Sequence, residues 1–61
     1  MQQMTEAIKE VKEFIVKYPE KKDAAIELLD LFETEVASGS SPDHELELLR
    51  NDLADLEYGE D

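Results

Sequence analysis

The sequence contains no cysteine and no tryptophan, and it has only two prolines, two glycines and one histidine among 61 residues. Without cysteine it forms neither a disulfide nor a thiolate metal site, so helix packing or self-association must stabilise it. No apolar run approaches the ~18 residues of a membrane span, and the start lacks the apolar core of a signal peptide. We therefore expect a cytoplasmic protein that does not bind membranes.

Positive charge is also scarce. The chain has six Lys and Arg against 17 Asp and Glu, a formal net charge of −11. Residues 1–22 have a net charge of +1, whereas residues 23–61 contain 13 acids and a single basic residue, Arg50. Because phosphate contacts require Lys and Arg clustered on one face, direct nucleic-acid binding is disfavoured. The expected partner is an electropositive protein that associates rapidly and in a salt-sensitive way.

The chain length and the positions of proline and glycine predict a single helical domain, residues 1–61. A chain of this size buries only about 60% of its unfolded surface, so marginal stability or dimerisation is expected. Two prolines and one glycine separate three stretches in which apolar residues recur three and four apart. These stretches predict helices over about residues 3–18, 20–37 and 42–58, followed by a frayed tail at 59–61.

Short connections between three such helices favour neighbouring antiparallel packing, and hence an all-α three-helix bundle. The alternative is a helical hairpin of the second and third segments that dimerises into a four-helix bundle. Ala7 and Phe14 widen one flank of the first apolar stripe. The predicted core consists of Ile8, Val11, Ile15, Leu28, Leu29, Phe32, Val36, Leu46, Leu49, Leu53 and Leu56.

Catalytic chemistry is not expected. Paired carboxylates act as general acid and base only where a pocket separates their pKa values, and so short a helical domain has little interior for one. His44 has no second His or Cys with which to share a metal, and neither glycine sits in a calcium-binding pattern. The sequence thus predicts no catalytic residue, no metal and no cofactor.

Two apolar residues depart from the helical stripes. Leu48 lies roughly 120° off the third stripe, among acids, and Ile26 lies about 100° off the second. A single exposed aliphatic residue is ordinary on any protein, but one surrounded by carboxylates is also a candidate contact. The predicted partner-binding face comprises Glu45, Leu48, Asp52, Asp55, Asp30 and Glu27.

Three functions remain open. The first is a regulatory or inhibitory module that acts by protein contact, with apolar residues giving affinity and acids steering association. The second is a mimic of the nucleic-acid backbone, because the second and third helices side by side would carry about one charge per 2 Å, near the ~1.7 Å of duplex DNA. The third is a structural subunit or homodimer kept soluble by its charge. Small acidic helical proteins of phages and mobile elements offer an analogy of size and charge alone.

Overall fold

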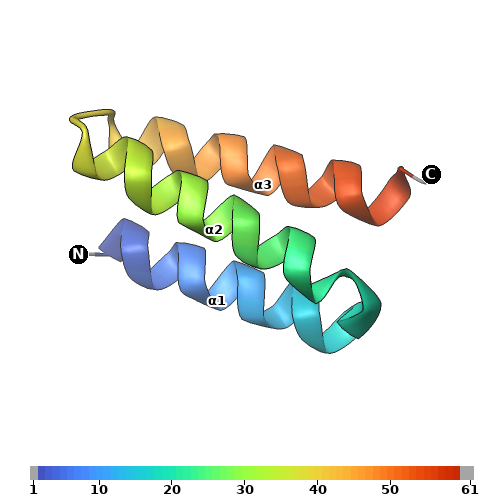
Figure 1. Ribbon diagram of the computed structural model, residues 1–61. Coiled ribbons are helices and arrows are strands. Elements are labelled where there is room, and N and C mark those ends of the chain that lie inside the picture. The colour runs from blue at the N-terminus through green and yellow to red at the C-terminus, as the bar shows by residue number, and fades with distance from the viewer. Residues whose placement is uncertain (1, 60–61) are drawn as a thin grey trace.

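The helices form close to where the apolar spacing places them. The structure is a computed structural model that describes residues 2–59. Helix α1 spans Gln2–Lys17, α2 spans Lys22–Ala37 and α3 spans Pro42–Tyr58 (Figure 1). The three helices contact one another, which confirms the all-α three-helix bundle.

Pro19 opens a separate turn of 3-10 helix, η1, over Pro19–Lys21, where the sequence predicted the start of the second α-helix. Proline suits this position because it has no N–H to leave unpaired and its φ is already helical. Lys21 closes the turn by donating its N–H to the Tyr18 carbonyl at 2.9 Å. The second α-helix therefore begins two residues later than predicted, at Lys22.

Gly39 ends α2 and turns the chain toward α3. It has a φ of +110°, which favours glycine, and its N–H donates to the Val36 carbonyl at 3.1 Å. The Ser40 N–H donates to the Glu35 carbonyl at 3.0 Å, which completes a Schellman motif. Ser41 then caps α3 ahead of Pro42.

At the other end of α3, Gly59 is extended, with φ −76°. The rest of the predicted frayed tail, residues 60–61, lies outside the described residues.

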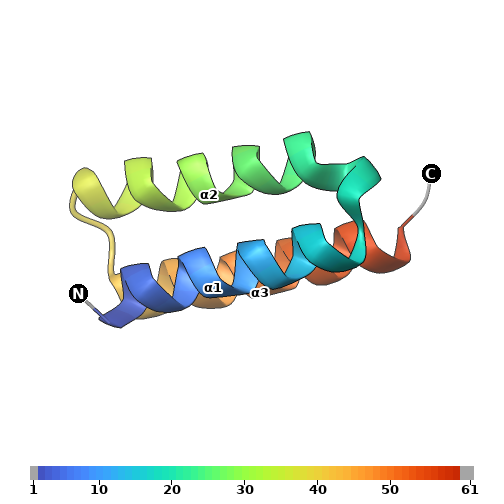
Figure 2. The same ribbon diagram turned by 90° about the horizontal axis from the view of Figure 1, so that it is seen from below.

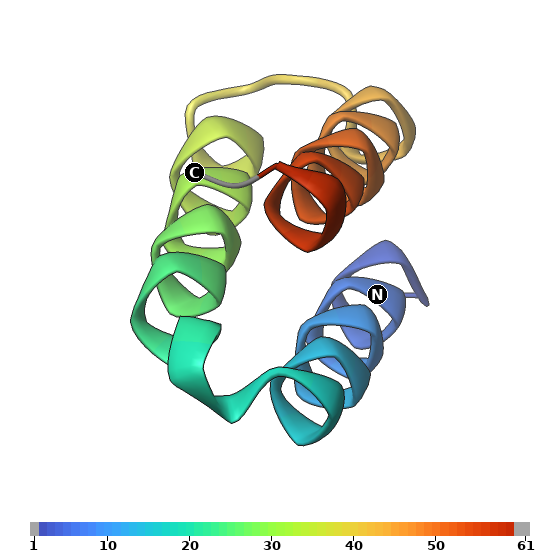
Figure 3. The ribbon, with the colours of Figure 1, turned by 90° about the vertical axis from the view of Figure 1, so that its right-hand side faces the viewer.

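The bundle is an elongated triangle of helices, 32 × 19 × 15 Å in extent. α2 runs antiparallel to α1 and α3 (Figure 1), and the views from below and from the end show α1 beside α3 with α2 opposite them (Figures 2 and 3). Each helix therefore contributes one face to a shared core and leaves another face to solvent. The buried residues are Ala7, Val11, Phe14, Ala25, Phe32, Leu46, Leu49 and Leu53.

Of the core predicted from sequence, five residues are buried: Val11, Phe32, Leu46, Leu49 and Leu53. Five more pack against this cluster while partly exposed, and these are Ile15, Leu28, Leu29, Val36 and Leu56.

Ile8 was wrongly placed in the core, since it is 37% exposed. The buried line of α1 instead passes through Ala7, Val11 and Phe14, two of which the sequence put at a flank. One residue further along a helix is a rotation of about 100°, so burying Ala7 turns Ile8 outward. Glu6 and Glu10 lie on the other flank of α1, which faces α3 and pairs with its Arg50.

Polar contacts align α1 with α3. Arg50 on α3 pairs with Glu10 at 3.1 Å and with Glu6 at 3.6 Å. Nearer the start of α1, Gln3 Nε2 donates to Asp43 Oδ1 at 2.8 Å. Exposed pairs of this kind contribute about 0.2–1 kcal/mol each, so they favour this orientation of α1 by that modest amount. With α1 held on this side, the opposite side of the α2 and α3 pair stays open.

Candidate functional site

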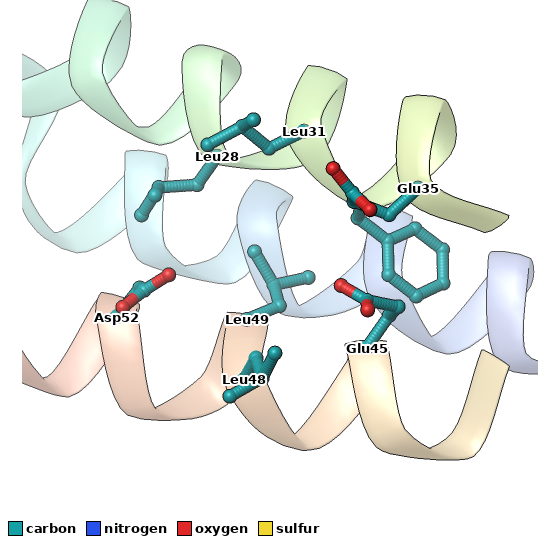
Figure 4. A pocket seen from close by; sticks show the side chains of 8 residues that line it. Leu28, Leu31, Glu35, Glu45, Leu48, Leu49 and Asp52 are labelled. Atoms are coloured by element: carbon teal, nitrogen blue, oxygen red, sulfur yellow. The ribbon is translucent and has the colours of Figure 1, made fainter. Parts of the chain in front are cut away.

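A groove runs between α2 and α3 on the face turned away from α1, which lies behind it in Figure 4. The half near the connection between the two helices is lined by Leu28, Leu31, Phe32, Glu35, Glu45, Leu48, Leu49 and Asp52. The other half is lined by Ala24, Glu27, Leu28, Asp52, Asp55, Leu56 and Gly59. Leu28 and Asp52 belong to both halves, so the two join into one feature, which we call the α2–α3 groove.

The floor of the α2–α3 groove is apolar. Phe32 and Leu49 form its base and are buried in the core. Leu31 and Leu48 rise from α2 and α3 on either side and are 56% and 42% exposed. Leu28, one turn before Leu31 on α2, is partly buried against the core. The floor therefore presents aliphatic surface that the bundle itself does not cover.

The rim is acidic on both sides. Glu27 and Glu35 come from α2, and Glu45, Asp52 and Asp55 come from α3. Glu35 and Glu45 lie on opposite sides of the groove in Figure 4. Among the described residues, none of these five carboxylates has an ion pair or a side-chain hydrogen bond. The rim thus has five unneutralised negative charges and no lysine or arginine.

Two rim carboxylates occupy positions that do not favour the helix. Glu35 lies in the last turn of α2 and Asp55 in the last turn of α3, and neither turn contains a basic residue. Negative charge at a helix C-terminus opposes the helix dipole, at about 0.3–1 kcal/mol per charge. At the end of α3, Lys21 Nζ donates to the Leu56 carbonyl and offsets part of this penalty, whereas no basic side chain makes such a contact at the end of α2 among the described residues.

Helical spacing explains why these side chains share one face. On α3, Glu45, Leu48, Asp52 and Asp55 follow one another at intervals of three, four and three residues, which stacks them on adjacent turns. On α2, Leu28, Leu31 and Glu35 repeat the same spacing. The two rows border the buried stripes and meet when α2 and α3 pack.

The structure brings together five of the six predicted partner-binding residues. Glu45, Leu48, Asp52 and Asp55 line the groove from α3, and Glu27 lines it from α2. Asp30 does not, because it lies about 160° around α2 from Leu28, two residues along. Asp30 is exposed on the outer face of α2.

Sequence reasoning missed Leu31 and Glu35 as parts of this site. Both fell inside the widened apolar stripe of the second helix, where residues are expected to face the core, and their three- and four-residue spacing from Leu28 was the available signal. Ile26, by contrast, is 39% exposed but lies on the flank of α2 opposite Leu31. Phe14, which the sequence places at the flank of the first apolar stripe, is buried in the core.

The positive side chains belong to α1, η1, the start of α2 and, as Arg50, α3. Lys21 Nζ donates to the Leu56 carbonyl at 2.5 Å and lies 5.5 Å from the centre of the Tyr18 ring. The Tyr18 hydroxyl donates to Glu57 Oε2 at 3.0 Å, and this hydrogen bond raises the pKa of Tyr18 above its ordinary value because ionisation would destroy it and place two negative charges together. Over residues 2–59, every charged side chain that lines the groove is negative, and Lys21 contacts the groove-lining Leu56 through that residue's backbone carbonyl.

Residues 2–59 offer no group of three or more His, Asp or Glu side chains placed to hold a metal ion. His44 lies exposed in the first turn of α3, where its backbone N–H points at the Ser41 hydroxyl. Over the same residues, no helix has both the length and the apolar character needed to cross a membrane. At the groove itself, the exposed leucines allow apolar contact and the carboxylates attract positive charge.

Comparisons with protein-family models, with curated proteins and with solved structures find no match to this chain.

Proposed function

We propose that this protein is a small regulatory module without catalytic activity that binds an electropositive protein segment in the α2–α3 groove. The observation that carries this proposal is the combination of an exposed leucine floor with carboxylates on both rims. Apolar contact supplies affinity, while the negative rim accelerates association and rejects acidic partners. Inhibition or regulation of the partner follows where the captured segment is needed for the partner's own activity.

Apolar surface in the groove favours the module over the nucleic-acid mimic. Phosphate mimicry by carboxylates does not account for Leu31 and Leu48, which stand exposed in the same rows as the acids. A homodimer through this face is also disfavoured. A two-fold contact would bring each acidic rim against its own copy, and like charges brought together oppose association.

Comparative affinity capture tests the proposal. Four tagged baits are exposed to lysate of the source organism: the parent chain, Leu48→Ala, the double variant Asp52→Asn with Asp55→Asn, and the control Asp30→Asn with Glu33→Gln. Like the groove variant, the control removes two negative charges three residues apart, but it does so at exposed positions outside the groove. Thermal melts first establish that all four are folded.

A protein retained by the parent and the control but lost by both groove variants supports the module. Loss from both double variants alike, with Leu48→Ala unaffected, shows that only net charge matters and contradicts the groove. A nucleic-acid-binding protein that duplex DNA displaces from the bait would favour the mimic. Capture of no partner, together with a dimeric mass, would favour the structural subunit.

A further inference from the structure

We infer that the segment bound in the α2–α3 groove is a basic amphipathic helix that lies along α2 and α3 and completes a four-helix bundle. This inference rests on the proposed function and specifies the chemistry and conformation of the occupant. Three features of the groove lead to it: its length, the polarity of its floor and the distribution of charge on its two rims.

Groove length matches a short helix. On the α3 side the lining runs from Glu45 to Gly59, the extended residue that follows the helix. The thirteen helical steps from Glu45 to Tyr58 at ~1.5 Å per residue correspond to about 20 Å. A helix of about 14 residues, or four turns, covers that length, and packed helices lie about 8–10 Å apart. A helix of this length can therefore pack against α2 and α3 on the side opposite α1.

The polarity of the floor selects a helix over an extended peptide. A strand laid on Leu28, Leu31 and Leu48 would turn backbone N–H and C=O groups onto aliphatic surface, where they find no partner. Residues 2–59 contain no β-strand, so no sheet edge is present to pair with such a peptide. A helix satisfies its own backbone groups internally and presents only side chains to the leucines.

The rims specify the charge pattern of that helix. Because Glu27 and Glu35 border one side and Glu45, Asp52 and Asp55 border the other, Lys or Arg must flank the apolar stripe of the partner on both sides. Flanking charges of this kind set partner choice and orientation where helices pack side by side. The fitting partner therefore has leucine-like anchors at positions i, i+3 or i+4, and i+7, with basic residues beside them.

A matched pair of synthetic peptides of about 14 residues tests the inference. Both contain the same numbers of Leu and Lys. In the first, Leu recurs three and four apart with Lys on both flanks; in the second, Leu and Lys alternate with the period of a strand. Binding is measured by fluorescence anisotropy, helix content by circular dichroism, and the contact surface by amide chemical shifts of the labelled protein.

We expect the helical-period peptide to bind at least about tenfold more tightly than the alternating one. Because an isolated helix of this length is marginal in water, its helix content should rise on mixing. Amide shifts should concentrate at Leu28, Leu31, Leu48 and Asp52. Asp52→Asn with Asp55→Asn should weaken binding more than Asp30→Asn with Glu33→Gln does.

Other outcomes separate this inference from the proposed function. Equal affinity of the two peptides, with shifts still in the groove, would overturn the helical occupant and leave the groove as a site for basic segments. Failure of both peptides to shift groove amides would overturn the inference and the proposed function together. Groove shifts that appear with protein concentration alone, without peptide binding, would identify a second copy as the occupant and overturn a basic partner.

Discussion

Neutralising two rim carboxylates should make the protein more stable while it weakens partner binding. The perturbation is Asp52→Asn combined with Asp55→Asn, which keeps side-chain size and removes two negative charges. Neither carboxylate has an ion pair or hydrogen bond among the described residues, so no stabilising contact is lost. What disappears is repulsion between side chains one turn apart on α3 and between Asp55 and the end of that helix.

The gain can be worked out from the geometry. Like charges one turn apart on a helix destabilise it by about 0.2–0.5 kcal/mol. Asp55 stands in the last turn of α3, which contains no basic residue of its own, and this adds about 0.3–1 kcal/mol of unfavourable dipole interaction, toward the lower figure because Lys21 Nζ donates to the Leu56 carbonyl in that turn. The sum is a rise in unfolding free energy of about 0.5–1.5 kcal/mol. For a domain of this size, that corresponds to an increase in Tm of roughly 3–10 °C.

Thermal unfolding followed by circular dichroism measures this change at low salt and at about 1 M salt, where the Debye length is only about 3 Å. The matched control, Asp30→Asn with Glu33→Gln, also relieves repulsion between acids one turn apart. Both of its residues precede the last turn of α2, so it relieves less of the dipole interaction and should raise Tm less. A lower Tm for the groove variant at low salt, or a gain that persists unchanged in high salt, would refute the electrostatic account.

Three further substitutions test the fold around the groove. Gly39→Ala should lower the unfolding free energy by about 1–2 kcal/mol, because its φ is +110° and an added Cβ meets no atom within 4 Å, so backbone strain acts alone; an unchanged midpoint in a urea titration would contradict this. Tyr18→Phe removes the hydroxyl that donates to Glu57. Because the folded-state pKa of Tyr18 is raised, that stabilisation is present below the ordinary value of 10.0 and is lost as pH rises through the folded pKa. The parent should therefore lose more stability than the variant in melts on the alkaline side, and equal losses would argue against the hydrogen bond. Arg50→Gln should lower the unfolding free energy by about 0.5–1 kcal/mol in dilute buffer and by less in concentrated salt, and a salt-independent loss would point to packing by the Arg50 side chain in place of ion pairing.

Much of the candidate site follows from local spacing. Glu45, Leu48, Asp52 and Asp55 fall on one helical face because intervals of three and four residues repeat every turn, whatever the rest of the chain does. Glu27 belongs to a different helix, and only the packing of α2 on α3 brings it beside Asp52 and Asp55. The same packing leaves Asp30 outside the groove, although Asp30, like Glu27, is an exposed acid on α2.

The sequence by itself determined the three helices, their approximate ends and the separation of an acidic part from a nearly neutral one, because apolar periodicity, proline, glycine and charge act over a few neighbouring residues. Only the tertiary structure decided how each helix is rotated about its axis. In α1, contacts from Arg50 to Glu6 and Glu10 accompany burial of Ala7 and exposure of Ile8. Such rotation depends on contacts between residues forty or more positions apart. Rotation of α2 and α3 turns one exposed flank of each helix into the two sides of a single groove.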